Sequence, residues 1–269
     1  MTSRISVRMI TAFTVGLAAS NPLETPLAAQ SLASRVTASE GVVQVIYPSR
    51  PNACGDGVGS IGNVFGESRM YSGDASWSGR DGWTLRQCVR GPARLVVTVV
   101  AGEVTRVRAY VGPIPPTSAD ARTISAGAAE AITWTSDVVA HGNSRLASEM
   151  ILPLILADGP EPWPTLLKVA RDDGRPRELR RSVMMWLSNG VSDHLGIVNA
   201  DRSTSDDDEM RNQAIYILSQ RPKSEGVPEL IELARSSKHP SARKTAIYWL
   251  GQSGDPRAVD VYAELLGLR

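Results

Sequence analysis

The 269-residue sequence predicts an α+β multidomain chain, in which a small disulfide-linked β domain precedes an α-α solenoid of about three to four helix pairs. Two observations predict this class. A pattern of apolar and basic residues occurs three times in the C-terminal part, beginning at Arg180, Arg211 and Arg243, so the copies are 31 and 32 residues apart. Such a period is typical of stacked helical repeats. Earlier in the chain, β-branched segments surround the only two cysteines, Cys54 and Cys88.

The N-terminal residues 1–29 are predicted to be a signal peptide. Arg4 and Arg8 precede an apolar run of eleven residues, Met9 to Ala19, and small residues follow. This order is that of a secretory signal, and the run is too short to cross a bilayer as a helix. We therefore expect cleavage before Gln30 or after Ala19, a secreted or periplasmic protein, and no membrane span after signal removal. A short buried helix is the competing interpretation.

The charges of the chain nearly cancel. Lys and Arg number 29, Asp and Glu number 28, and the formal net charge is +1. A balanced chain has no basic field that would attract the phosphates of nucleic acid. We therefore expect no nucleic-acid partner.

Residues 30–112 are predicted to form a β-rich domain. Four segments have the composition of strands: 42–47, 83–89, 93–100 and 103–111. The last two are separated only by Ala101 and Gly102, which predicts a tight hairpin. Residues 48–82 are rich in Gly, Ser, Asn and Asp, and they predict either a long loop or a set of short strands.

Cys54 and Cys88 predict one disulfide in this domain. An even cysteine count in an exported chain favours a structural bond. A metal or redox pair is the alternative, but the chain has no CxxC spacing and no histidine near either cysteine. We therefore expect the bond, no metal and no cofactor.

Residues 113–159 are predicted to be a linker followed by a capping helical pair. Proline and glycine at 112–116 break the strand pattern, and segments 126–140 and 144–157 have helical composition. Pro153 could kink the second helix. The pair would cap the solenoid against the β domain.

Residues 160–269 are predicted to be repeats of two helices, named A and B. The predicted A/B pairs are 163–173 with 177–188, 191–200 with 208–219, and 226–237 with 241–252, followed by a last A helix over 255–268. The B helices share an apolar face at spacing i, i+4, i+7 and i+8. Its residues are Leu179, Val183, Trp186 and Leu187, then Met210, Ala214, Ile217 and Leu218, then Ala242, Ala246, Trp249 and Leu250. We expect all of them to be buried.

Several short segments of this region resemble the HEAT-repeat family. They are LLKVAR at 166–171, LIELAR at 230–235 and WLGQSGDPRAV at 249–259, and the resemblance covers about residues 160–269. The whole chain is similar to secreted bacterial HEAT-repeat proteins. The resemblance implies a solenoid that acts as a protein-binding scaffold, with the B helices lining its concave surface.

The face of the B helices opposite the apolar stripe is the predicted binding surface. Its candidate residues are Arg181, Met185, Tyr216, Lys244 and Tyr248. Tyrosine and methionine side chains suit a protein or peptide partner, because they bury apolar area and adapt to its shape. The alternative is that this face packs against the capping helices or is only solvated. The expected partner is another protein, whose identity the sequence does not give.

Three further motifs could support other functions. Gly57 to Gly62 fits GxGxxG but lies inside the disulfide loop, so a loop is favoured over a nucleotide site. Ser205 precedes four acidic residues, 206–209, and a helix start is favoured over a calcium site. Asp137 and His141 are four residues apart, and a hydrogen-bonded helix end is favoured over an acid–base pair.

These motifs leave two alternatives to the scaffold. One is an enzyme, or an enzyme subunit, with its site at the β/helical junction near Asp137 and His141. The other is a structural component of a cell-envelope assembly. No motif requires an enzyme, so the binding protein is favoured. A cleft with buried polar neighbours around Asp137 and His141 would favour the enzyme, and an open concave face would favour the scaffold.

Overall fold

The computed structural model describes residues 30–62, 64–65, 70–72, 88–116, 121–200 and 205–268. The chain divides into two compact units, Met1–Gln30 and Ser31–Arg269, and the second unit contains both the β region and the helices. The predicted signal peptide, residues 1–29, lies outside the described residues. The N-terminal β region with its disulfide and the following run of helices confirm the predicted fold class.

A four-stranded sheet forms the larger part of the β region. Its strands, in spatial order, are β7 (Glu103–Val111), β6 (Ala93–Val100), β1 (Gly41–Tyr47) and β8 (Arg122–Ser125). β1 is antiparallel to β6 and parallel to β8. The predicted hairpin is confirmed, because β6 and β7 pair around Ala101 and Gly102, whose φ angles are 52° and 77°. β8 also belongs to this sheet, although its residues follow residue 112, the last residue of the predicted β domain.

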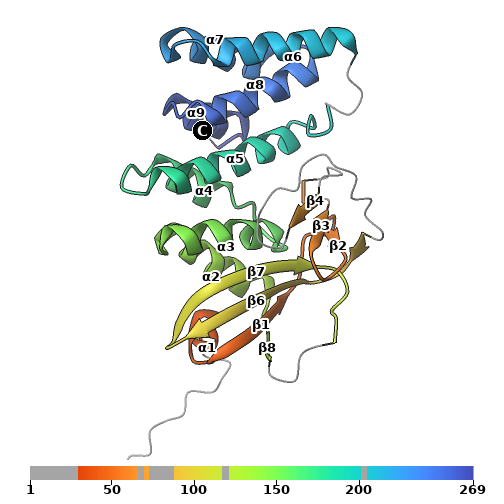
Figure 1. Cartoon of the computed structure of the whole chain (residues 1–269), viewed down its shortest axis with the longest axis vertical. Helices are drawn as coiled ribbons and strands as arrows, with labels where there is room; N and C mark the ends of the chain where they lie inside the picture. Colours follow the sequence, from red (N-terminus) through yellow and green to blue (C-terminus); the bar gives the residue numbers. More distant parts are fainter. Residues whose placement is uncertain are drawn as a thin grey trace, which may run out of the picture. The chain divides into compact units, whose positions relative to one another are not determined.

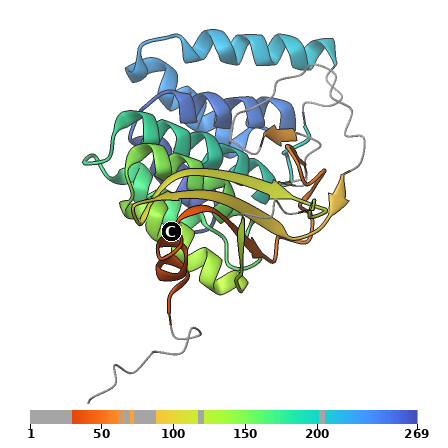
Figure 2. The same cartoon turned by 60° about the horizontal axis from the view of Figure 1, so that its bottom comes forward.

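This sheet packs against helix α3 (Ser144–Leu156). The side chains of Val43, Val45, Leu95 and Val97 alternate along β1 and β6 and are fully buried, as are most residues of α3. The Tyr47 hydroxyl donates a hydrogen bond to the carbonyl oxygen of Pro153, 3.0 Å away. Burial raises the pKa of this tyrosine. Figure 2 shows the sheet in front of the helices, so strands and helices share one core.

A second sheet of short strands lies beside the first. Its order is β4 (Met70–Ser72), β3 (Ser60–Gly62), β2 (Cys54–Gly55) and β5 (Val89–Arg90). The predicted disulfide is confirmed: Cys54 and Cys88 are bonded, with their Cα atoms 5.0 Å apart. Of the predicted strand 83–89, all but the last two residues lie outside the described ones. Residues 48–62 therefore contain short strands rather than one long loop.

The predicted helical pair before the repeats is confirmed. Helix α2 (Ala128–His141) ends at Gly142, and α3 begins after Asn143, whose side-chain oxygen accepts a hydrogen bond from the Leu146 N–H at 3.0 Å. This is the usual way in which an asparagine starts a helix. Helix α1 (Leu32–Thr37) packs against α2.

Six helices follow in the described part of residues 160–268, and they depart from the predicted pairs at one place. They are α4 (Trp163–Arg171), α5 (Arg177–His194), α6 (Asp206–Ser219), α7 (Lys223–Ser236), α8 (Pro240–Gln252) and α9 (Arg257–Leu265). The prediction of a separate helix over 191–200 is wrong, because residues 191–194 continue α5. Gly190 does not end α5. A Cβ there would lie 2.5 Å from the Trp163 ring, so the glycine allows α4 to approach closely.

The helical layers are not stacked in the order of the sequence. Helix α8 packs against α5 on one side and against α6 and α7 on the other, and α9 contacts α4 and α5. The spatial order of the pairs is therefore α2/α3, α4/α5, α8/α9 and α6/α7, as Figure 1 shows. In a simple solenoid each repeat contacts its neighbours in sequence. Here the α8/α9 pair lies between two pairs that precede it in the chain.

The connection between α5 and α6 covers residues 195–205. Its described part, residues 195–200, forms hydrogen-bonded turns after the end of α5. Lys244 of α8 holds this connection, since its Nζ donates to the carbonyl oxygen of Val198 at 2.5 Å. Lys244 is buried, so the prediction that it lies on the open face is wrong.

The helix face that was predicted to be buried is buried in α5 but not in α6. Leu179, Val183, Trp186 and Leu187 are all buried. On α6 the only buried residue is Ile215, and Met210 and Ile217 are exposed. Helix α6 belongs to the outermost layer, so only one side of it meets other described helices, and that side is not the one predicted. On α8 the predicted residues are buried except Trp249, which is half-buried.

The buried position of Lys244 changes the expected cost of removing it. We expect Lys244→Ala to lower the free energy of unfolding by about 1 to 3 kcal/mol, because the Val198 carbonyl loses its charged donor. Urea unfolding measures this loss. The control is Lys238→Ala, at an exposed position just before α8, which should change stability by less than about 0.5 kcal/mol. Equal effects of the two changes would contradict the burial of Lys244.

Candidate protein-binding site

Three aromatic rings from two helices meet at the surface of the helical stack. The ring centroids of Tyr216 on α6 and Trp249 on α8 are 5.2 Å apart, and those of Tyr248 and Trp249 are 5.1 Å apart. Trp249 is half-buried, whereas Tyr216 and Tyr248 are 41% and 45% exposed. We call these three residues the aromatic cluster. Its tryptophan anchors it to the core, and its two tyrosines face solvent.

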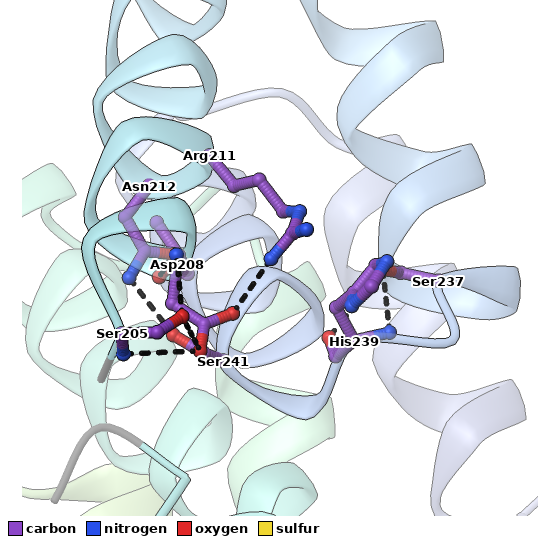
Figure 3. A network of polar contacts seen from close by, with 8 residues as sticks. Ser205, Asp208, Arg211, Asn212, Ser237, His239 and Ser241 are labelled. Atoms are coloured by element: carbon purple, nitrogen blue, oxygen red, sulfur yellow. Dashed lines mark hydrogen bonds and ion pairs between the residues drawn. The ribbon is translucent and has the colours of Figure 1, made fainter. Parts of the chain in front are cut away.

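A polar network fixes the two helices that carry the cluster. The Asn212 amide nitrogen donates to the Ser241 hydroxyl at 2.8 Å, and its oxygen accepts from the Thr245 hydroxyl at 2.8 Å. Figure 3 shows Asn212 of α6 beside Ser241 of α8. One asparagine therefore makes two hydrogen bonds to the neighbouring helix. These bonds set the position of Tyr216 relative to Tyr248 and Trp249.

The acidic segment before Asn212 forms the start of α6. The Ser205 hydroxyl accepts a hydrogen bond from the Asp208 N–H at 3.2 Å, and the Asp208 carboxylate accepts from the Ser205 hydroxyl and from Arg211. Figure 3 shows these contacts. The hydrogen bonds from Ser205, and then the Arg211 guanidinium, lower the pKa of Asp208. The helix-start interpretation is confirmed, and no group of three metal-ligating side chains occurs among the described residues.

The structure brings together only some of the predicted binding residues. Tyr216 and Tyr248 meet in the aromatic cluster. Arg181 of α5 is exposed, and its Nε donates to Gln252 Oε1 of α8 at 3.4 Å. Met185 is partly buried against the core, and Lys244 is buried. The available surface therefore consists of the aromatic cluster, with Arg181 on the adjacent layer.

Sequence reasoning missed Trp249 as a surface residue and assigned it to the core. Trp186, Ile217 and Trp249 occupy the same repeat position, and their exposure differs: Trp186 is buried, Trp249 is half-buried and Ile217 is exposed. The position of each layer in the stack decides the difference, so no signal within a single repeat could have found it.

The pair Asp137 and His141 lies on the outer surface of α2. His141 Nδ1 and Asp137 Oδ1 are 2.9 Å apart, and both side chains are mostly exposed. The two residues do interact, but in solvent on one helix. This is the geometry of a hydrogen-bonded helix end rather than of an acid–base pair in a cleft.

The GxGxxG segment forms a loop and a strand. The N–H groups of Val58, Gly59 and Ser60 donate to one carboxylate oxygen of Asp56, at 2.8 to 2.9 Å. Gly57 has φ +76°, and a Cβ there would lie 1.9 Å from the Pro113 carbonyl oxygen. Strand β3 follows, whereas a dinucleotide site requires a helix at this place.

Comparison with known families identifies the C-terminal part of the chain. The family model of HEAT repeats matches residues 200–268, which contain the aromatic cluster. This part of the chain is therefore similar to HEAT repeats. Comparisons with curated proteins and with solved structures found no match. Among the described residues, no helix has both the length and the apolar composition that a membrane span requires.

Proposed function

We propose that this protein is a binding scaffold whose HEAT repeats hold another protein at the aromatic cluster. HEAT repeats commonly mediate contacts between proteins. The observation that carries the proposal is the meeting of Tyr216 and Tyr248, both more than two-fifths exposed, around Trp249. Tyrosine and tryptophan are enriched among the residues that dominate binding energy.

The geometry of the cluster suits a peptide or a protein edge. The tryptophan is held by the core, so a partner need not order it, and the cost of immobilising side chains on binding is small. The hydroxyl of each tyrosine can hydrogen-bond a backbone group while its ring covers apolar atoms. Arg181 adds a positive charge on the adjacent layer. These features favour a partner with apolar side chains and an accessible backbone.

We also propose that the scaffold acts outside the cytoplasm, either secreted or in a periplasm. The N-terminal arrangement of arginines, apolar run and small residues supports export. The Cys54–Cys88 bond agrees with this location, because disulfides persist in oxidising compartments. Mass spectrometry of protein from its source should find a chain that begins near Gln30. An intact chain from Met1 in the cytosol would contradict export.

The test of binding is the double change Tyr216→Ala and Tyr248→Ala. Both side chains are substantially exposed, so we expect the fold to remain and partner capture to weaken by about tenfold or more. Affinity capture from the exported fraction of the source, with mass spectrometry, identifies the partner. Titration of the purified partner then measures the change in Kd.

The matched control is the double change Val58→Ala and Val100→Ala. It also removes two exposed large side chains, but both belong to the β region and neither is part of the aromatic cluster or of α6. We expect partner affinity to stay within about twofold of wild type. If the tyrosine variant folds normally and keeps its partner, the binding site lies elsewhere.

A further inference from the structure

Helix α6 carries an apolar stripe on its outer side. Met210 and Ile217 are 68% and 59% exposed, and Ala214 between them is exposed as well. Their spacing of i, i+4 and i+7 is that of Leu179, Val183 and Trp186 on α5, which are buried within the stack. In contrast, the side of α6 that faces α8 contains Asn212. The apolar face of α6 therefore points away from the layers that bury the equivalent face of α5.

Charged residues lie at the two ends of this stripe. Asp206 and Asp207 are exposed in the first turn of α6, and Arg221 is exposed just after its last turn. At about 100° per residue, Asp206, Asp207, Met210, Ala214 and Ile217 fall within about 100° of the helix circumference. We call these five residues, with Arg221, the outer stripe. It is acidic at one end, apolar in the middle and basic at the other end.

The outer stripe is complementary to itself when it is reversed. Asp207 and Arg221 each stand seven residues from Ala214, while Met210 stands four residues before it and Ile217 three after it. Two antiparallel copies that cross at Ala214 would therefore place Met210 against Ile217, and Asp207 against Arg221. The small side chain of Ala214 allows the helices to approach at the crossing. This is the self-complementary arrangement that a two-fold interface requires.

We propose that a second copy of this chain docks on the outer stripe, through antiparallel packing of α6 against α6. Opposite charges, Asp207 of one copy and Arg221 of the other, would meet at both ends of the pair. Arg221 Nε lies 3.8 Å from Glu225 Oε2 of its own chain, and both side chains are more than half exposed. Its guanidinium has further donors to offer an aspartate.

The dimer would leave the aromatic cluster open. Tyr216 precedes Ile217 by one residue, so it is turned about 100° away from that residue around α6. It contacts Trp249 on the side toward α8. A dimer through the outer stripe would thus present two aromatic clusters, one on each copy.

The first test measures the mass of the purified chain in solution. Helix α6 is 14 residues long, or about 21 Å, so its face is smaller than a standard interface of roughly 800 Å² per partner. We therefore expect a weak dimer, with Kd of about 1 to 100 µM by sedimentation equilibrium. Ile217→Asp should weaken it by at least about tenfold, because it buries an aspartate of each copy against Met210 of the other. Val58→Asp changes an equally exposed valine of the β region and should have no effect.

The second test separates this orientation from other dimers. Arg221→Glu should weaken dimerisation by several-fold, and adding Asp207→Arg should restore it, because the reversed pair again has opposite charges. Ala214→Cys should form an intermolecular disulfide with its own counterpart on mild oxidation, since the two-fold axis brings these residues together. Ser224→Cys, on an exposed position of α7, should not.

Three results would overturn the proposal. They are a monomer at about 500 µM, well above the expected Kd, a dimer that Ile217→Asp does not affect, and a dimer in which Ala214→Cys does not cross-link. Circular dichroism of each variant checks that the helices remain folded. All substituted positions are exposed, so the variants should retain the wild-type spectrum.

Discussion

Trp186→Ala should lower the free energy of unfolding by about 3 to 5 kcal/mol, the largest loss that we expect from a single change in the helical stack. Trp186 is 1% exposed, and its ring centroid lies 6.1 Å from that of Phe65. Phe65 also stacks on Trp163 of α4, again at 6.1 Å. Truncating the indole to a methyl group would leave a cavity where Phe65, in the turn after β3, packs against α4 and α5. Urea unfolding followed by circular dichroism measures the loss.

The control for this change is Trp249→Ala. The repeat pattern alone predicts the same cost of about 3 to 5 kcal/mol at both tryptophans, since they occupy equivalent positions. The structure makes them different, because Trp249 is only half-buried and flanked by exposed tyrosines. We therefore expect Trp249→Ala to cost less than Trp186→Ala. Equal losses would mean that α8 is packed as the simple repeat predicts.

Replacing both cysteines by serine should lower the free energy of unfolding by about 4 kcal/mol, because the bond closes a long loop in the unfolded chain. Cys54 and Cys88 are 34 residues apart. Within the second sheet, the bond joins β2 to the residue before β5. Without it, we expect the β2–β5 sheet to loosen. Urea unfolding of the oxidised wild type and of the double variant measures the difference.

A reduced wild-type sample provides the control for the loss of two sulfur atoms. If the bond itself stabilises the fold, the reduced wild type and the serine variant should unfold at similar urea concentrations. A thiol titration of the denatured, oxidised protein should find no free thiol. Two free thiols would contradict the bond, and an unchanged urea midpoint in the variant would contradict its stabilising effect.

The sequence predicts those parts of the fold that depend on local chemistry. The alternation along β1 and β6, the turn at Ala101 and Gly102, and the helix start at Ser205 are all visible in short windows of residues. The order of the helical layers is not visible in this way. It depends on which layers meet, and therefore on the long connection after α5 and its contact with Lys244. A repeat pattern assumes sequential stacking and places α6 wrongly.

The candidate site is predictable to a similar extent. The repeat positions of Tyr216 and Tyr248 point both tyrosines away from the core, and the structure leaves both exposed. Lys244 was also predicted to point away from the core, but it is buried. Its long side chain reaches the α5–α6 connection and donates a hydrogen bond to the Val198 carbonyl oxygen. The sequence shows neither that connection's path nor the half-exposed Trp249. Both follow from contacts between residues far apart in the chain.

The position of α8 and α9 between α4/α5 and α6/α7 has a consequence for synthesis. A solenoid stacked in sequence can add each repeat to a finished surface as the chain leaves the ribosome. Here α6 and α7 are translated before the layer on which they rest. Until α8 and α9 emerge, the surface of α5 that they cover, which includes the backbone at Met184 beside Gly251 of α8, stays open to water. The nascent chain would then depend on chaperones, or on delayed folding, until its last two helices are complete.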